Sequence, residues 1–172
     1  MRWRKGELGD DSTHWSNSLP VAAVGKSLYR GVSLFVGECV GGGFIGAKTT
    51  LIHPENIFLG KNSYINGGMI AASSEAKILI GDNCMISYGV HMRVDSHCHG
   101  KIDVPMIRQG HSHKNIVVGD DVWIGYGAQI MSGITIGSGA IVAAGAIVTK
   151  DVPAFSVVAG VPARMVKKRG CG

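Results

Sequence analysis

An aliphatic residue recurs at every sixth position through the second half of the chain, and another apolar residue follows each one four positions later. The first series is Val118, Ile124, Ile130, Ile136, Val142 and Val148, and the second is Val122, Ala128, Ile134, Ala140, Ala146 and Val152. A period of six fits neither the 3.6-residue period of a helix nor the two-residue period of a plain strand. The pattern predicts an all-β solenoid in which short strands and turns alternate around a stacked apolar interior.

Small residues occupy the position directly after four of the six aliphatic residues: Gly119, Gly125, Gly137 and Ala143. A position restricted to small side chains indicates a tight corner or a close approach of two backbones. The chain holds 26 glycines without a collagen period. Repeated solenoid corners account for this abundance.

The repeat extends upstream with less regular spacing, in groups that begin at Ile45, Leu59 and Ile80. Cys84 falls on an inward position and is expected to behave as a small buried residue. None of the four cysteines forms a Cys-x-x-Cys pair, so the sequence predicts neither a zinc knuckle nor a disulfide framework.

Residues 1–35 lack the repeat, and we expect them to form an N-terminal cap or lead-in segment. Within them, residues 21–32 are compatible with a short capping helix, because solenoids require covered ends. Residues 36–172 are expected to form a single solenoid domain with a basic C-terminal tail.

The repeat is interrupted once, by an extended loop over about 93–116. This segment holds four histidines, four cationic side chains and one proline. Long loops in compact domains are usually functional, and solenoids place insertions on one face that is often the binding face. The interruption is therefore the first place to look for chemistry.

Composition excludes several classes of protein. Apolar residues make up 45% of the chain and charged residues 17%, which excludes a disordered chain. No apolar run reaches the roughly 20 residues of a membrane span, and the first residues lack the apolar core of a signal peptide. We therefore expect a cytoplasmic protein with no integral membrane segment.

The net charge is +5, and residues 164–169 form a basic run. No aromatic platform or recognition motif accompanies this charge, so nucleic acid is not an expected partner. A phosphorylated small molecule needs only a few such cations.

Three motifs resemble the hexapeptide-repeat acyltransferases, in particular the sugar and xenobiotic O-acetyltransferases similar to maltose and galactoside acetyltransferases. They are Ile116–Gly125 (IVVGDDVWIG), Gly145–Pro153 (GAIVTKDVP) and Ala159–Arg164 (AGVPAR), and the resemblance covers about residues 45–169. It implies a left-handed parallel β-helix and a homotrimer with acetyl-CoA bound between subunits. It also implies a catalytic histidine on the loop that leaves the solenoid.

His97 is the expected general base. Counting from the turn Ile80–Asn83 brings the family's catalytic position to His97, and the sequence Asp-Ser-His matches relatives. A histidine suits the task because an attacking hydroxyl must lose its proton near neutral pH. His99 is the runner-up. Many relatives have proline where this chain has Cys98, so the match to the family's catalytic position can shift by one or two residues. Asp95 either orients the imidazole or forms a turn.

The resemblance also assigns binding residues. For acetyl-CoA they are Trp123, Tyr126, Ala144, Thr149, Lys150, Arg164 and Lys167, although Tyr126 stands where relatives often have a small or polar residue. Arg164 and Lys167 match cations near the 3′-phosphate. Asn66 and Arg93 are expected on the acceptor side.

The expected activity is direct transfer of an acetyl group from acetyl-CoA to a saccharide hydroxyl within a ternary complex. No metal is expected as a cofactor. Alternatives are an acceptor that is an antibiotic, another xenobiotic or an amino sugar, which a histidine base does not distinguish. More distant alternatives are a metal enzyme similar to γ-carbonic anhydrases and a non-catalytic trimeric scaffold.

Overall fold

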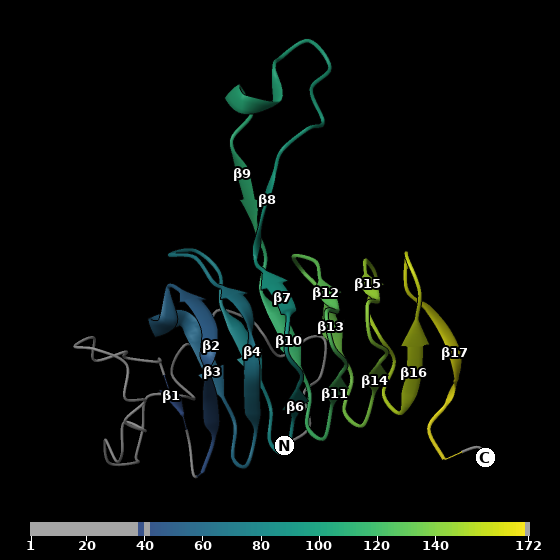
Figure 1. Cartoon of the computed structure of the whole chain (residues 1–172). Helices are drawn as coiled ribbons and strands as arrows, with labels where there is room; N and C mark the ends of the chain where they lie inside the picture. The colour runs from purple at the N-terminus through teal and green to yellow at the C-terminus, as the bar shows by residue number, and fades with distance from the viewer. Residues whose placement is uncertain (1–37, 40–41, 171–172) are drawn as a thin grey trace, which may run out of the picture.

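The computed structural model describes residues 38–39 and 42–170, so the expected N-terminal cap lies outside the described residues. The described chain winds into a parallel β-solenoid of about five turns, whose strands form three faces (Figure 1). The all-β solenoid predicted from the repeat and the parallel strands implied by the family resemblance are confirmed. The first face consists of β1 (Glu38–Cys39), β3 (Ile57–Leu59), β5 (Ile78–Ile80), β10 (Ile116–Val118) and β13 (Thr135–Ile136).

The other two faces are joined into one sheet by long strands that continue round a corner. These are β2 (Phe44–Ile52) and β4 (Tyr64–Ala71); β4 pairs first with β6 and then with β7. The second face continues through β6 (Met85–Ile86), β11 (Trp123–Ile124), β14 (Ile141–Val142) and β16 (Ser156–Ala159). The third face continues through β7 (Val90–Arg93), β12 (Gln129–Ile130) and β15 (Ile147–Val148).

The predicted inward residues form the core. All twelve positions of the two repeating series are buried, each with an exposed fraction of 5% or less. Cys84 is also fully buried, and its thiol lies 3.0 Å from the carbonyl oxygen of Gly119. Burial raises the pKa of the Cys84 thiol to about 11, so it stays protonated and acts as an apolar core residue.

The small residues at the corners are explained by close backbone contact between stacked turns. A β-carbon added to Gly119 would lie 2.7 Å from the backbone nitrogen of Ser138, and one added to Gly125 would lie 2.6 Å from that of Ala144. Both distances are shorter than van der Waals contact. The prediction of close approach at these positions is confirmed.

The interruption of the repeat is an ordered hairpin arm rather than an open loop. Its strands are β8 (Asp95–His97) and β9 (His111–His113), which pair antiparallel and project away from the solenoid (Figure 1). Near the tip lies the 3₁₀ turn η2 (Met106–Arg108), and a second such turn, η1 (Pro54–Asn56), lies at a solenoid corner. The Gln109 side chain closes the tip by accepting from the Lys101 N–H and donating to the Val104 carbonyl.

The solenoid ends in the strand β17 (Arg164–Lys168), which turns back and pairs antiparallel with β16. The Arg169 guanidinium lies 2.7 Å from the Asp121 carboxylate and fastens the chain after β17 to an earlier turn. Among the described residues, no helix is long and apolar enough to cross a membrane.

Substitution of Gly119 by alanine tests the stacking of the turns. The new methyl group would meet the backbone of Ser138, so we expect Gly119→Ala to cost about 1–3 kcal/mol of unfolding free energy. Gly100→Ala is the matched control, because Gly100 lies in the arm with no atom within 4 Å of an added β-carbon. Urea denaturation of both variants measures the difference. Equal stability of the two would contradict close stacking at this corner.

Candidate active site

The arm leaves the solenoid between the third and fourth turns, and Val94 anchors its base. Val94 is fully buried, and its N–H donates to the Ala71 carbonyl in the preceding turn. Its carbonyl oxygen accepts from the Lys114 N–H at 2.9 Å and from the Ser132 hydroxyl at 2.6 Å. The two ends of the arm are therefore tied together and to turns on both sides.

The pairing of β8 with β9 sorts their side chains onto two sides of the arm. Ser96 lies opposite Ser112, whereas the pairs on either side are Asp95 with His113 and His97 with His111. Since successive residues of a strand point to opposite sides, the two serines share one side and the other four residues share the second. We call these the serine side and the histidine side.

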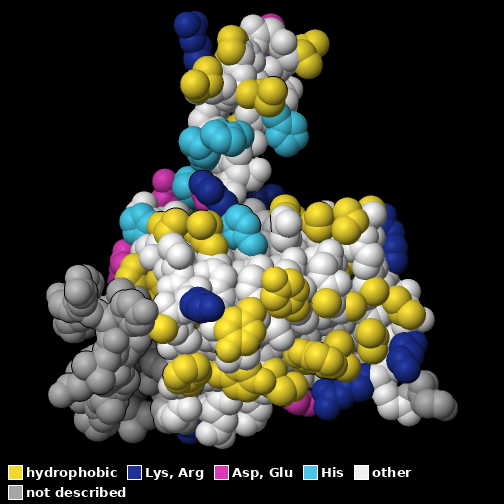
Figure 2. Space-filling view, viewed as in Figure 1, with side chains coloured by type: hydrophobic (Ala, Val, Ile, Leu, Met, Phe, Trp, Pro, Cys, Tyr) yellow, Lys and Arg dark blue, Asp and Glu magenta, His cyan; other side chains and the backbone are white. Residues whose placement is uncertain are grey.

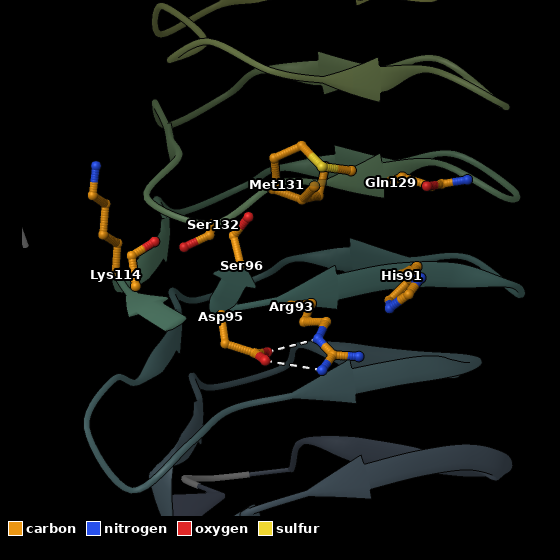
Figure 3. A pocket seen from close by; sticks show the side chains of 10 residues that line it. His91, Arg93, Asp95, Ser96, Lys114, Gln129, Met131 and Ser132 are labelled. Carbon is orange, nitrogen blue, oxygen red and sulfur yellow. Dashed lines mark hydrogen bonds and ion pairs between the residues drawn. The ribbon is translucent and has the colours of Figure 1, made fainter. Parts of the chain in front are cut away.

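The serine side borders a pocket of about 430 Å³ on the third face (Figure 3). The pocket contains two cationic side chains, one carboxylate, three serines, a glutamine and an apolar patch, which suits a polar ligand with several hydrogen-bonding groups. Its lining residues are His91, Arg93, Asp95, Ser96, Ser112, Lys114, Gln129, Ile130, Met131 and Ser132.

The histidine side turns toward the earlier turns of the solenoid. The His113 Nδ1 lies 3.0 Å from the Ser73 hydroxyl, and its Nε2 lies 3.8 Å from the Glu75 carboxylate. Figure 2 shows histidine side chains gathered along the lower part of the arm. His113 thus fixes the arm against the corner that precedes β5.

His97 is exposed on the histidine side and does not line the pocket. Its ring centroid lies 4.3 Å from that of His111, across the hairpin. The runner-up His99 is also exposed, and its Nδ1 lies 3.1 Å from the His97 carbonyl oxygen. The structure therefore presents both candidate bases on the arm, with His97 nearer the solenoid.

Asp95 is joined to Arg93 by two hydrogen bonds (Figure 3). The Arg93 Nε lies 2.6 Å from Oδ1, and Nη2 lies 2.9 Å from Oδ2. The hydrogen bonds to Arg93 hold the pKa of the Asp95 carboxyl below its usual value. No hydrogen bond among the described residues joins Asp95 to His97, so an orienting role for Asp95 stays a prediction.

The residues assigned to acetyl-CoA follow the arm in the chain and lie on later turns. Lys150 and Arg164 line one small pocket of about 170 Å³, together with Asp151, Pro153 and Met165 among others. The remaining assigned residues, Trp123, Tyr126, Ala144, Thr149 and Lys167, are exposed. Two of the assigned cations therefore border the same pocket and the other five residues are accessible, and their role in coenzyme binding stays a prediction.

On the acceptor side, Asn66 is half-buried on β4, two turns before β12, and Arg93 lies at the base of the arm. His91 was not among the site residues expected from the sequence. His91 is half-buried on β7 and lines the pocket, and no hydrogen-bond partner for its buried Nε2 is present among the described residues. The pairing of His91 with Gln129 across stacked turns has no signal in the local sequence.

The fold and the repeat define the chain as a hexapeptide-repeat protein. Residues 115–150 match the family model described as bacterial transferase hexapeptide (six repeats). The galactoside O-acetyltransferase of Escherichia coli K12 is 31% identical over 83% of this chain and 68% of its own length.

Solved structures agree with this match. A maltose O-acetyltransferase from Clostridium difficile 630 is 30% identical over 77% of this chain and 70% of its own, with a TM-score of 0.68. A hexapeptide-repeat acetyltransferase of Vibrio cholerae complexed with acetyl coenzyme A is 31% identical over 74% and 71% of the two chains, with a TM-score of 0.59. The chain belongs to the hexapeptide-repeat acetyltransferase family. It spans about two thirds of the length of that galactoside O-acetyltransferase and a smaller share of several other curated relatives.

Replacing Asp95 by asparagine tests the ion pair at the arm base. Because the Arg93 side chain is 54% exposed, we expect a local loss within the ~0.2–1 kcal/mol of a surface pair. This corresponds to amide exchange of β8 and β9 that is up to about fivefold faster. Asp103→Asn, at the exposed arm tip, is the control and should leave exchange unchanged.

The same measurement has a defined pH dependence. The lowered pKa of Asp95 means that the pair stabilises the arm above the ordinary aspartate pKa and that this stabilisation is lost as pH falls through the lowered pKa. The exchange difference between Asp95→Asn and the parent should therefore shrink in acid. A difference that persists after protonation would show that the carboxylate charge is not what holds the arm base.

Proposed function

We propose that this chain is an acetyl-CoA-dependent O-acetyltransferase that acetylates a saccharide hydroxyl at the base of the arm. The observation that carries the proposal is the position of His97. An exposed imidazole stands on an ordered hairpin between the turns that bear the cofactor-binding residues and the turn that bears Asn66. A surface polysaccharide unit or its precursor sugar is the acceptor that the family resemblance favours.

The reaction needs one proton acceptor and two bound substrates. The acceptor hydroxyl loses its proton to His97 as its oxygen attacks the thioester carbonyl. The C–O bond forms, the C–S bond breaks, and the proton passes from the imidazolium to the sulfur of coenzyme A. Transfer is direct within a ternary complex, and no covalent acyl-enzyme is required.

The order of the residues along the solenoid supports separate approaches for the two substrates. The coenzyme lies along the later turns, with its phosphates near Lys150 and Arg164. The acceptor lies toward the earlier turns, where Asn66 is placed on β4. The arm between them brings His97 to the point where the thioester and the hydroxyl meet.

A column of apolar side chains on the second face supports assembly into a homotrimer. The strand register aligns Phe44, Tyr64, Met85, Trp123, Ile141 and Val157 along the length of the solenoid. Phe44 is 57% exposed and Trp123 46%, and Figure 2 shows apolar side chains along the body of the molecule. A continuous apolar surface of this kind is typical of a protein–protein interface. Trp123 would then border both the interface and the coenzyme.

His97→Ala tests the assignment of the base. We expect kcat to fall by about 10²–10⁴-fold while the affinity for coenzyme A is retained, because the imidazole acts on the proton and not on coenzyme binding. His99→Ala is the matched control, two residues further along the same limb of the arm. Severe loss in His99→Ala with near parental turnover in His97→Ala would move the base to His99.

Arg164→Ala tests the phosphate end of the coenzyme site. Loss of a charge-assisted contact at an exposed site should raise the KM for acetyl-CoA roughly tenfold and leave kcat near the parental value. Acetyl-CoA lacking the 3′-phosphate should show the same KM with both proteins. If Arg164→Ala raised both KM values equally, Arg164 would not recognise that phosphate.

The acceptor is identified by a screen with labelled acetyl-CoA across sugars, nucleotide sugars, amino sugars and antibiotics. Label transferred to a saccharide hydroxyl supports the proposal. Transfer only to an amine or to an antibiotic would replace the saccharide as acceptor. Neither transfer nor binding of acetyl-CoA would favour a non-catalytic scaffold.

A further inference from the structure

The arm carries more imidazole than one general base requires. His97, His99, His111 and His113 alternate along the two limbs of the hairpin. His113 is occupied by Ser73, and the His99 Nδ1 is directed at the His97 carbonyl. His97 and His111 remain as a facing pair.

We propose that His97 and His111 together form a binding site for a divalent transition-metal ion of the zinc type, and that occupation of this site inhibits the enzyme. The binding claim rests on the pair alone. The inhibition claim rests on the proposed function, in which His97 must have a free lone pair to accept a proton. The ion is an inhibitor in this proposal and not a cofactor.

The register of the hairpin places the two imidazoles at the spacing that chelation needs. The Cys98 N–H donates to the Gly110 carbonyl, which makes these two residues a hydrogen-bonded pair. The adjacent pair, His97 with His111, is then a non-hydrogen-bonded pair, in which opposed side chains lie closest. Their ring centroids are 4.3 Å apart and the rings are inclined by 42°.

Only a small movement separates this arrangement from a chelated one. Metal–nitrogen bonds of about 2.0–2.1 Å put two imidazole centroids on one zinc ion roughly 5 Å apart. Both side chains are exposed, so rotation of the rings meets little resistance and water can complete the coordination. Imidazole is a preferred ligand of zinc, nickel and copper ions.

The surroundings limit the site to two protein ligands. Asp95, on the same side of the arm, is held by Arg93, and the His111 ring centroid lies 6.3 Å from that of His113. Within the described part of the chain, no group of three or more histidine, cysteine, aspartate or glutamate side chains is arranged to hold a metal ion. A two-ligand site binds weakly and reversibly, as suits an inhibitory ion rather than a permanent one.

Zinc binding is measured on the full-length protein by competition with a chromophoric chelator, in a Cys98→Ser background that removes the thiol of the arm. We expect His111→Ala and His97→Ala each to weaken binding by about tenfold or more. His113→Ala is the matched control, because it removes a histidine from the same side without touching the pair. Equal zinc affinity in His111→Ala and the parent, or no binding by the parent, would overturn the site.

Inhibition is measured separately from initial rates of labelled acetyl transfer, at zinc in excess of the released coenzyme A, because zinc bound to that thiol would disturb a thiol-detection readout. Zinc should inhibit the parent and His113→Ala, a chelator should reverse the effect, and His111→Ala should be active and resistant. Zinc bound through the pair without inhibition would leave the metal site intact and overturn His97 as the base. Acetyl transfer by a parent that binds no zinc would leave the function intact and overturn the metal site.

Discussion

The stacking of each solenoid turn directly on the next is the constraint on which the rest of the structure depends. Parallel strands one turn apart share backbone hydrogen bonds, and the corners bring backbone atoms too close for a β-carbon at Gly119 or Gly125. The inward side chains must therefore keep one register along the whole axis. Outward side chains do not have to meet this requirement. Binding residues can therefore vary along the outer faces, where the stacking of the turns already fixes their spacing.

The arm is compatible with this constraint because it leaves the stack at one residue and returns at nearly the same place. Val94 keeps its inward position, and its carbonyl accepts from Lys114, the first residue after β9. The fourth turn consequently stacks on the third as if the insertion were absent, with β10 in register with β5. The insertion changes what the third face displays and leaves the core intact.

The solenoid was predictable from the sequence because its signal is local and repeated. Every inward position from Val118 to Val152 follows from the six-residue period, and burial of Cys84 follows from the equivalent position in the upstream group that begins at Ile80. The small residues after the aliphatic positions predicted the close corners, because a larger side chain there would meet the backbone of the next turn. Inward burial and close backbone contact at the corners recur in every turn. A single sequence therefore shows the residue preference for each of them several times.

The site was less predictable because it depends on contacts that occur once. The hairpin pairs Asp95 with His113 across a long connection, whereas the sequence predicted only an extended loop over this segment. The engagement of Asp95 by Arg93, two residues away on the chain, gave no signal that distinguished it from an interaction with His97. His91 is half-buried on β7, in register with Met69 and Gln129 of the neighbouring turns, and nothing in its local sequence indicated a place in the pocket.

The proposed coenzyme site and the arm that carries His97 are held in place by different kinds of contact. Lys150 follows the core strand β15 and Arg164 lies on β17, which is paired with β16, whereas the arm depends on a few bonds at its base and on an exposed hairpin. Segments with few buried contacts open locally at low free-energy cost, and a base carried on such a segment can adjust to an acceptor. The coenzyme site does not have to move with it. Acceptor preference can therefore change through the arm and its pocket while the coenzyme site and the stacked core stay the same.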